Sequence, residues 1–179
     1  MLSQKIEKAL NAQLNAELYS AYLYFSMSAY FESKALKGFA HWMRVQAQEE
    51  MVHAVKFYNY INERGGRVAV TAIQGPPTDW KAPVDVFAHT YAHEQKVTGL
   101  INDIASLALE EKDHVTGTML QWFLNEQIEE ESTASGLHQQ LVLIGDTRGP
   151  LLMLDRELAQ RVFVPPPGMG GAPAAQPGP

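Results

Sequence analysis

Apolar residues recur at alternating steps of three and four along four long segments of the chain, which is the periodicity of amphipathic helices. Glycine and proline residues mark where these segments begin and end. Pro83 and Pro150 each suit the first position of a helix, because the N–H that proline lacks has no partner there. We expect four long helices and a short fifth one, which span residues 3–32, 38–64, 83–112, 113–144 and 150–163.

The connections between these helices predict how they pack. Short joints link the first helix to the second and the third to the fourth, so each pair should be antiparallel. Between the two pairs lies the loop "RVAVTAIQGPPTDWKA", for which we expect a short extended piece. About seventeen extended residues reach about 56 Å, enough to run along a helix of about 45 Å. We therefore expect an all-α fold, a four-helix bundle with one long crossover between helices 2 and 3 plus a short C-terminal fifth helix.

Polar residues interrupt all four apolar seams near the middle of each helix. In "RVQAQEEMVHAVKFYNYI", the seam positions that precede Phe57 are Gln46, Glu50 and His53, where a core face should continue. The carboxylates nearest the four helix midpoints are Glu17, Glu50, Glu94 and Glu130. Because the midpoints of antiparallel helices share one level, we expect these carboxylates to converge.

A bound metal is the simplest explanation for four buried carboxylates at one level. An unpaired buried carboxylate costs several kcal/mol, and no Lys or Arg occupies these seam positions. Two divalent cations would balance the four negative charges. Carboxylate oxygens with one imidazole suit Fe(II) or Mn(II). Any one of these residues, taken alone, is better interpreted as a polar residue at the edge of a seam or as a core histidine. The agreement of four seams favours metal.

Composition narrows the class of protein further. The chain has 179 residues, of which 46% are hydrophobic, and suits one domain. Its net charge of -6 gives no indication of nucleic-acid or anionic-membrane binding. The absence of cysteine excludes disulfides, thiolate metal sites and cysteine nucleophiles. With no signal-peptide core and no apolar run that could cross a bilayer, we expect a cytoplasmic protein.

The end of the chain differs in composition from the rest. The segment "PPPGMGGAPAAQPGP" is rich in proline and glycine and has too little apolar surface to build a core. We therefore expect a helical domain over residues 1–163 and a mobile tail over residues 164–179.

Four segments in order resemble a known family: "NAELYSAYLYFSMSAYF", "AQEEMVHAVKFYNYI", "TYAHEQKVTGLIN" and "MLQWFLNEQIEEES". Over roughly residues 2–163 the chain resembles a ferritin of the bacterial non-haem type. The resemblance implies a hollow shell of twenty-four subunits that oxidises Fe(II) with O2 or H2O2 and stores the ferric mineral inside. It also implies that "PLLMLDRELAQRVF" is the short helix at the four-fold axis of that shell.

The same resemblance assigns roles to individual residues. It implies that Glu17, Glu50 and His53 hold a first iron, with Glu50 bridging to the second. Glu94 and Glu130 would hold the second iron. It further implies that Gln127 supports the iron pair and that Tyr24 is a tyrosine beside the centre and a candidate electron donor. A third, accessory iron site is matched by Glu49, Glu126 and Glu129 together with Glu130.

Several features leave alternatives open. Tyr24 also suits a plain core position, and residues 126, 129 and 130 also suit a solvated helix face. Met51 falls where haem-binding bacterioferritins carry their axial methionine, although packing explains it as well. Those proteins have a second Glu-x-x-His motif, and here Gln127-Ile128-Glu129-Glu130 stands in its place. A structural or binding bundle without redox activity is a further alternative, and it predicts no bound iron.

Two related classes of iron protein fit the sequence less well. Rubrerythrin-like peroxidases need cysteine, and DNA-protecting mini-ferritins would not be expected to have the fifth helix.

The sequence departs from the family at the expected route of iron entry. Family members often place acids along a three-fold channel early in the fourth helix. Here the corresponding residues 116–120 contain no carboxylate, which leaves Asp113, Glu110 and Glu111 as candidates.

Overall fold

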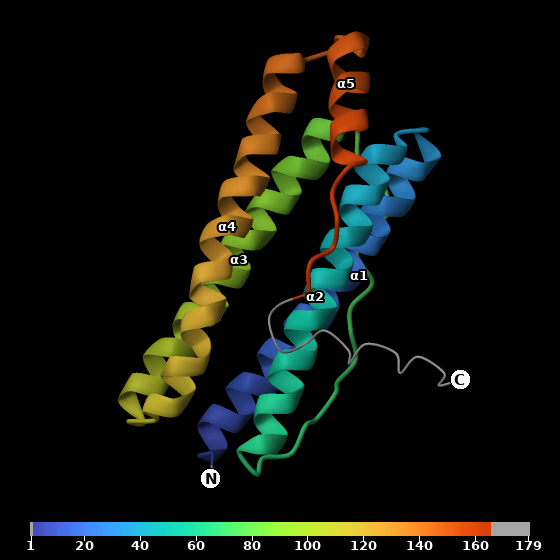
Figure 1. The fold of residues 1–179 in the computed structure, drawn as a ribbon. Helices are drawn as coiled ribbons and strands as arrows, with labels where there is room; N and C mark the ends of the chain where they lie inside the picture. The colour runs from blue at the N-terminus through green and yellow to red at the C-terminus, as the bar shows by residue number, and fades with distance from the viewer. Residues whose placement is uncertain (1, 166–179) are drawn as a thin grey trace, which may run out of the picture.

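The structure is a computed structural model, and it describes residues 2–165. Within that range it contains five α-helices and no strand. Their bounds are α1 Gln4–Ser33, α2 Lys37–Glu63, α3 Pro83–Glu110, α4 His114–Ile144 and α5 Arg148–Leu158. The all-α fold with four long helices and a short C-terminal one is confirmed (Figure 1).

The helix ends follow the local chemistry of the sequence. Ser3 precedes α1 and its hydroxyl accepts a hydrogen bond from the Ile6 N–H at 3.3 Å. Pro83 opens α3. Asp113 precedes α4 and accepts from the Thr116 N–H at 3.1 Å. Such N-caps satisfy N–H groups that have no partner inside the helix.

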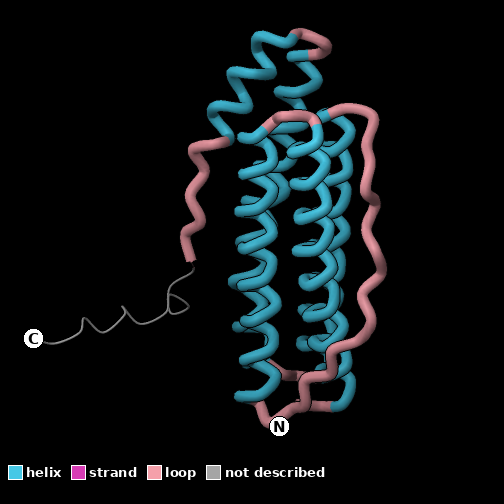
Figure 2. Tube along the Cα trace, turned by 90° about the vertical axis from the view of Figure 1, so that its right-hand side faces the viewer, coloured by secondary structure: helices cyan, strands magenta, loops and turns pink. Residues whose placement is uncertain are grey.

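The four long helices form two antiparallel hairpins, α1 with α2 and α3 with α4 (Figure 1). Residues 64–82 connect the hairpins and run along the bundle from one end to the other (Figure 2). Two side chains of α1 hold this crossover: Asn11 donates to the Arg67 carbonyl at 3.0 Å and accepts from the Ala69 N–H at 2.7 Å, and Ser26 donates to the Pro77 carbonyl at 2.6 Å. The predicted crossover is therefore present, and it binds to α1.

The structure differs from the predicted elements at the fifth helix. The crossover contains no strand, and its Arg67 carbonyl and Ala69 N–H bind the Asn11 side chain of α1. The fifth helix begins at Arg148 rather than at Pro150 and ends at Leu158 rather than near Phe163. A proline is tolerated at the third position because the first-turn N–H groups have no helical acceptor.

Two apolar clusters fill the bundle, one toward each end. The cluster near α5 includes Phe31, Phe39 and Phe87, in which Phe31 stacks on Phe39 with ring centroids 5.0 Å apart. The opposite cluster includes Phe57 and Phe123, which stack at 4.2 Å. The buried polar side chains between the clusters include Gln13, Glu17, Ser20, Gln46, Glu50, His53, Thr90, His93, Glu94 and Gln127. The core is thus apolar at both ends and polar in its middle.

The short helix α5 packs against the N-terminus of α2. Leu36, which precedes α2, makes no side-chain cap. The carboxylate of Asp155, on α5, accepts instead from the N–H groups of Gly38 at 2.8 Å and Phe39 at 3.0 Å. The backbones approach so closely that a Cβ at Gly38 would lie 1.5 Å from the Asp155 carbonyl oxygen. An N-cap from another helix therefore fixes where α5 lies.

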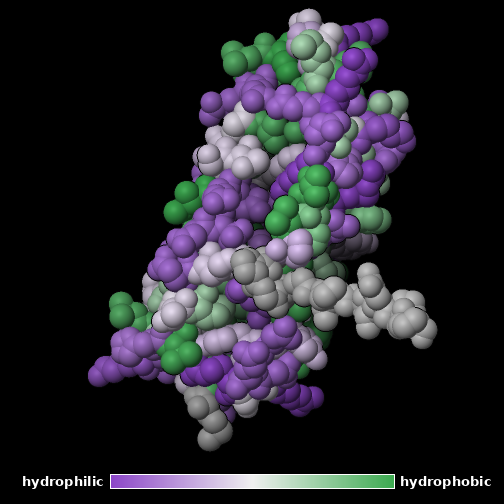
Figure 3. Space-filling view, in the orientation of Figure 1, coloured by the Kyte–Doolittle hydropathy of each residue, from purple (hydrophilic) through white to green (hydrophobic). Residues whose placement is uncertain are grey.

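The surface of the molecule is mostly hydrophilic on the face that Figure 3 shows, with apolar residues in small separate patches. Among the described residues, no helix combines the length and the apolar character that crossing a bilayer requires. Residues 166–179, most of the predicted mobile tail, lie outside the described part of the chain, so the boundary at residue 163 stays a prediction.

Candidate metal centre

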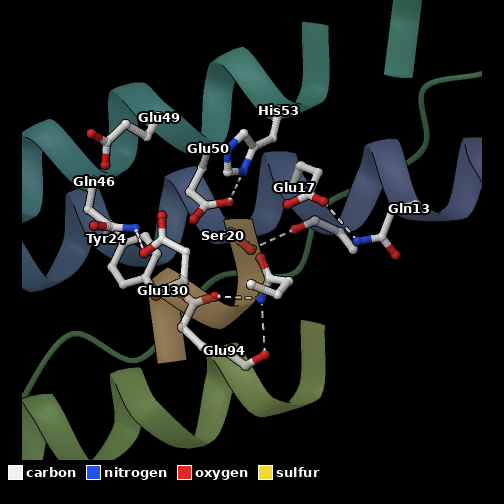
Figure 4. Close-up of polar contacts among 12 residues, drawn as sticks. Gln13, Glu17, Ser20, Tyr24, Gln46, Glu49, Glu50, His53, Glu94 and Glu130 are labelled. Atoms are coloured by element: carbon white, nitrogen blue, oxygen red, sulfur yellow. Dashed lines mark hydrogen bonds and ion pairs between the residues drawn. The ribbon is translucent and has the colours of Figure 1, made fainter. Parts of the chain in front are cut away.

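Two carboxylates and one imidazole meet in the middle of the first hairpin. Glu17 lies on α1, and Glu50 and His53 lie one turn apart on α2. One potential ligand atom from each lies within 4.8 Å of the other two, and all three side chains are buried. The His53 Nδ1 is 3.4 Å from the Glu50 Oε2. The three side chains point toward Glu94 and Glu130 of the other hairpin (Figure 4). The structure thus brings together the residues expected to hold the first iron.

The Glu17 carboxylate is only half satisfied by the protein. Its Oε1 accepts from Gln13 at 2.8 Å, one turn earlier on α1. Its Oε2 is buried and has no hydrogen-bond partner among the described residues. A buried acceptor without a partner is unfavourable, and a cation near Glu50 and His53 would supply the missing contact. The oxygen therefore fits a metal ligand.

Glu94 on α3 faces this cluster from the second hairpin. The Tyr24 hydroxyl donates to its Oε1, and the Gln127 side chain donates to its Oε2 at 3.2 Å. Gln127 also lies 3.3 Å from the Glu94 carbonyl oxygen. Tyr24 and Gln127 thus hold Glu94, an expected ligand of the second iron, by neutral donors.

Glu130 on α4 completes the set of four converging carboxylates. Its Oε2 accepts from the Gln46 amide at 2.6 Å (Figure 4). Gln46 lies one turn before Glu50 on α2. Gln46 lies on the seam of α2, and its spacing of four residues from Glu50 is a sequence signal for this contact.

Burial and mutual repulsion set the electrostatics of the site. Burial, followed by the charge of Glu50, raises the pKa of Glu17 to about 8. Burial raises the pKa of Glu94 to about 7, and burial with the Glu94 charge does the same for Glu130. Burial and the charges of Glu94 and Glu130 raise the pKa of Glu50 well above its ordinary range. The site therefore stabilises positive charge, either protons or metal ions.

Glu49, Glu126 and Glu129 line a second space. They surround a cavity of about 140 Å³ between α2 and α4, together with Glu130 and His53. Burial raises the pKa of Glu49 and of Glu126. The carboxylates expected for the accessory site therefore share one cavity. Among the described residues, however, only Glu17, Glu50 and His53 have ligand atoms close enough to form a compact cluster.

Met51 lies at the surface of the bundle and not in its core. It is 47% exposed and lines an apolar groove with Leu18, Tyr22 and Phe25. Trp42 is buried and lies against Phe87 with ring centroids 5.3 Å apart.

Two of the acids considered for iron access have partners of their own. Asp113 is bound by the Arg64 guanidinium at 3.0 Å, and Glu111 by the Lys5 ammonium at 2.9 Å. Asp113 also caps α4. Both side chains thus have structural roles where the sequence suggested an access route.

A bundle of this topology with a carboxylate–imidazole cluster at its centre has the architecture of metal-binding four-helix proteins. The family model that matches the chain is the ferritin-like domain, over residues 7–144. This match covers more than half of the chain, and the chain belongs to the ferritin family, of the bacterial non-haem type.

Relatives and solved structures agree with this placement. A bacterial non-heme ferritin of Bacteroides fragilis (strain 638R) is 43% identical over 161 residues, which cover 90% of this chain and 100% of the relative. One of Staphylococcus aureus (strain USA300) is 37% identical over 163 residues, 91% of this chain and 98% of the relative. Among solved structures, an engineered closed form of the Archaeoglobus fulgidus ferritin matches with a TM-score of 0.91 and 49% identity, covering 92% of this chain and 100% of that one. The open pore ferritin of the same archaeon matches with a TM-score of 0.90, covering 90% and 100%.

Proposed function

We propose that this protein is a ferroxidase that oxidises Fe(II) to Fe(III) as the first step of iron storage. The observation that carries the proposal is the cluster of Glu17, Glu50 and His53, with a buried Glu17 oxygen that has no partner. Glu94 and Glu130 lie across from it, and their charges add to burial in raising the pKa of Glu50. Iron storage itself is consistent with the family to which the chain belongs.

In this proposal, iron is the substrate and the carboxylates position it. Glu17, Glu50 and His53 hold one iron, Glu94 and Glu130 hold the other, and Glu50 bridges them. Gln127 keeps Glu94 in place through its 3.2 Å hydrogen bond. Each Fe(II) gives one electron, so that one pair reduces O2 to H2O2, or H2O2 to water, with uptake of two protons. Anionic oxygen ligands favour this direction because they stabilise Fe(III) more than Fe(II).

Tyr24 is the proposed redox-active side chain next to the centre. Its hydroxyl donates to Glu94, and burial followed by the Glu94 charge raises the pKa of the phenol. Tyr24 therefore stays protonated and in contact with a proposed ligand of the second iron. This contact favours an electron donor over a plain core tyrosine.

The remaining proposals concern the third iron and the assembly. Glu49, Glu126, Glu129 and Glu130 are proposed to hold an accessory iron, since they line one cavity next to His53. We further propose a shell of twenty-four copies with the ferric mineral inside, on the basis of the resemblance to ferritins. The cytoplasmic location stays a prediction.

The test is to remove a proposed ligand and measure oxidation. Glu50→Ala and His53→Ala should lower the rate of Fe(II) oxidation by at least about a hundredfold, because loss of groups that only orient metal ligands already costs 10–100-fold. Stopped-flow absorbance after anaerobic loading and mixing with O2 measures the rate. Glu63→Ala, an exposed acid at the end of α2, is the matched control and should leave it unchanged.

Assembly must be checked in the same samples. Size-exclusion chromatography with light scattering should give one particle size for all four proteins. If assembled Glu50→Ala oxidised iron at the wild-type rate, the assignment of the di-iron centre would be wrong. A redox-inactive bundle, the competing function, predicts no oxidation even in the wild type.

A further inference from the structure

The chain that follows α5 returns along α2 toward the accessory cavity. We call residues 159–165 the return segment. The His41 imidazole Nε2 binds the Arg161 carbonyl oxygen at 2.7 Å. The Arg161 guanidinium lies over the Trp42 ring, 4.4 Å from its centroid. Val164 lines the same cavity as Glu49 and Glu126. The return segment thus forms part of the cavity wall and places Arg161 at a fixed position in it.

The Arg161 guanidinium connects Glu49, a proposed ligand of the accessory iron, with Gln46, which binds Glu130. Its Nη2 donates to the Glu49 carboxylate at 2.5 Å, and its Nη1 donates to the Gln46 amide oxygen at 2.7 Å. About a fifth of the side chain of Arg161 and of Glu49 is exposed, so water screens this pair only in part.

The contact with Gln46 also determines what Gln46 does. An amide whose oxygen accepts from a guanidinium must direct its NH2 group elsewhere. Here the NH2 group donates to Glu130 at 2.6 Å. Arg161 therefore orients Glu49 directly and Glu130 through Gln46.

The charges that line the cavity determine how strongly it binds metal ions. Four carboxylates line the cavity, and Arg161 is the one Lys or Arg among its described lining residues. A divalent cation that binds Glu49 competes with the guanidinium for its Oε2 and is repelled by it at short range. The arginine thus competes with metal for the same carboxylate.

We propose that Arg161 is a positioning residue that acts as a tethered counter-cation, holding Glu49 and Gln46 and lowering the affinity of the accessory cavity for divalent metal. The inference rests on the proposed function of that cavity as an iron site. A weak site suits transit, because an ion that leaves the di-iron centre then passes through the cavity without being retained there.

Zinc titration of the iron-free assembled protein tests this proposal, because Zn²⁺ binds carboxylates without redox chemistry. Isothermal calorimetry should resolve a weak class of sites that Glu49→Gln weakens further. Arg161→Gln should tighten this class about tenfold, the size expected for removing one partly screened like charge. Arg161→Met removes the charge but keeps an apolar side chain over Trp42, and it should have the same effect. Arg156→Gln, an exposed arginine of α5, is the matched control and should change nothing.

Combining the substitutions separates the proposed contact from a general effect of charge. In the double variant Glu49→Gln/Arg161→Gln the gain should largely disappear, because the two residues act on each other. Unchanged or weaker zinc binding in both folded Arg161 variants would overturn the proposal. So would an equal gain in Arg156→Gln. Failure of the ferroxidase proposal is seen separately, in the oxidation rate of the wild-type protein, which the zinc titration does not use.

Discussion

At the scale of single residues, the four central carboxylates, Glu17, Glu50, Glu94 and Glu130, lie close enough for their charges to repel one another. Their raised pKa values show that the metal-free bundle holds protons there, with Glu17 at about 8 and Glu94 and Glu130 at about 7. In the unfolded chain the same groups titrate near 4.3. Protons and metal ions therefore compete for one set of oxygens.

This competition predicts how stability depends on pH. Between about pH 4.5 and 8 the folded state binds more of these protons than the unfolded chain, so the free energy of unfolding should fall as pH rises through that window. Thermal unfolding of the iron-free protein between pH 5.5 and 8.5 measures the slope. Glu17→Gln removes the group with pKa about 8 and should flatten the slope. Zn²⁺ should stabilise the protein more at the upper end of the range.

The opposite pH dependence of stability would contradict this prediction. If the unfolding temperature of the iron-free protein rose with pH and Glu17→Gln did not alter that rise, the carboxyl groups would not be protonated in the folded state. The difference between the two proteins isolates this effect, since all other titrating groups are shared.

The site residues that could be predicted from sequence are those whose helical spacing places them on one face. Glu17 and Glu50 occupy positions of a regular seam, and His53 follows Glu50 by one turn. Gln13 and Gln46 each lie four residues before a central glutamate, so the same spacing could have identified them. Arg161 could not be predicted, because it reaches Glu49 from 112 residues away through an irregular segment.

At the scale of elements, the position of α5 depends on the first turn of α2. The four long helices were predictable because each has its own periodic pattern and its own end signals. The contact of α5 with α2 was not, since Asp155 caps a helix that lies 117 residues earlier. Nothing in the local sequence of α2 indicates that its cap comes from elsewhere.

Gly38 offers a direct test of this packing. Gly38→Ala would place a methyl group 1.5 Å from the Asp155 carbonyl oxygen, so α5 should shift and its cap of α2 be lost. We expect a loss of about 1–2 kcal/mol in the free energy of unfolding, the usual size of a lost cap, and faster proteolysis after α5. Gly99→Ala in α3 is the control, because no atom lies within 4 Å of its new methyl group. It should be neutral or stabilising, and equal losses in both variants would contradict the packing described.

At the scale of the whole molecule, α5 and the tail should contribute differently to assembly. Leu154 and Leu158 of α5 are buried against the bundle, whereas Leu152 and Met153 are exposed on a single copy. A chain ending at residue 148 would lose that apolar surface, the Asp155 cap and Arg161. A chain ending at residue 165 would lose only the Pro/Gly-rich segment, whose composition offers few buried contacts.

Truncation at these two points separates the contributions. We expect the 1–165 chain to form particles of the wild-type size and the 1–148 chain to form smaller or leaking ones that retain less ferric mineral. Light scattering after size exclusion measures the first property, and iron retained after gel filtration measures the second. Dissociation of the 1–165 chain into dimers would show that the tail is structural and that the domain boundary at residue 163 is misplaced.

The division of the core into two apolar clusters with a polar layer between them has a consequence for cooperativity. Each cluster contains stacked aromatic rings of its own, around Phe31 and Phe39 at one end and around Phe57 and Phe123 at the other. The buried residues between them are largely polar, so without metal we expect each end of the bundle to open as a separate unit. Ions held by Glu17, Glu50 and His53, as proposed, would join α1 to α2 at the level between the clusters. The bound iron would then make the two ends of the bundle fold and unfold as one cooperative unit.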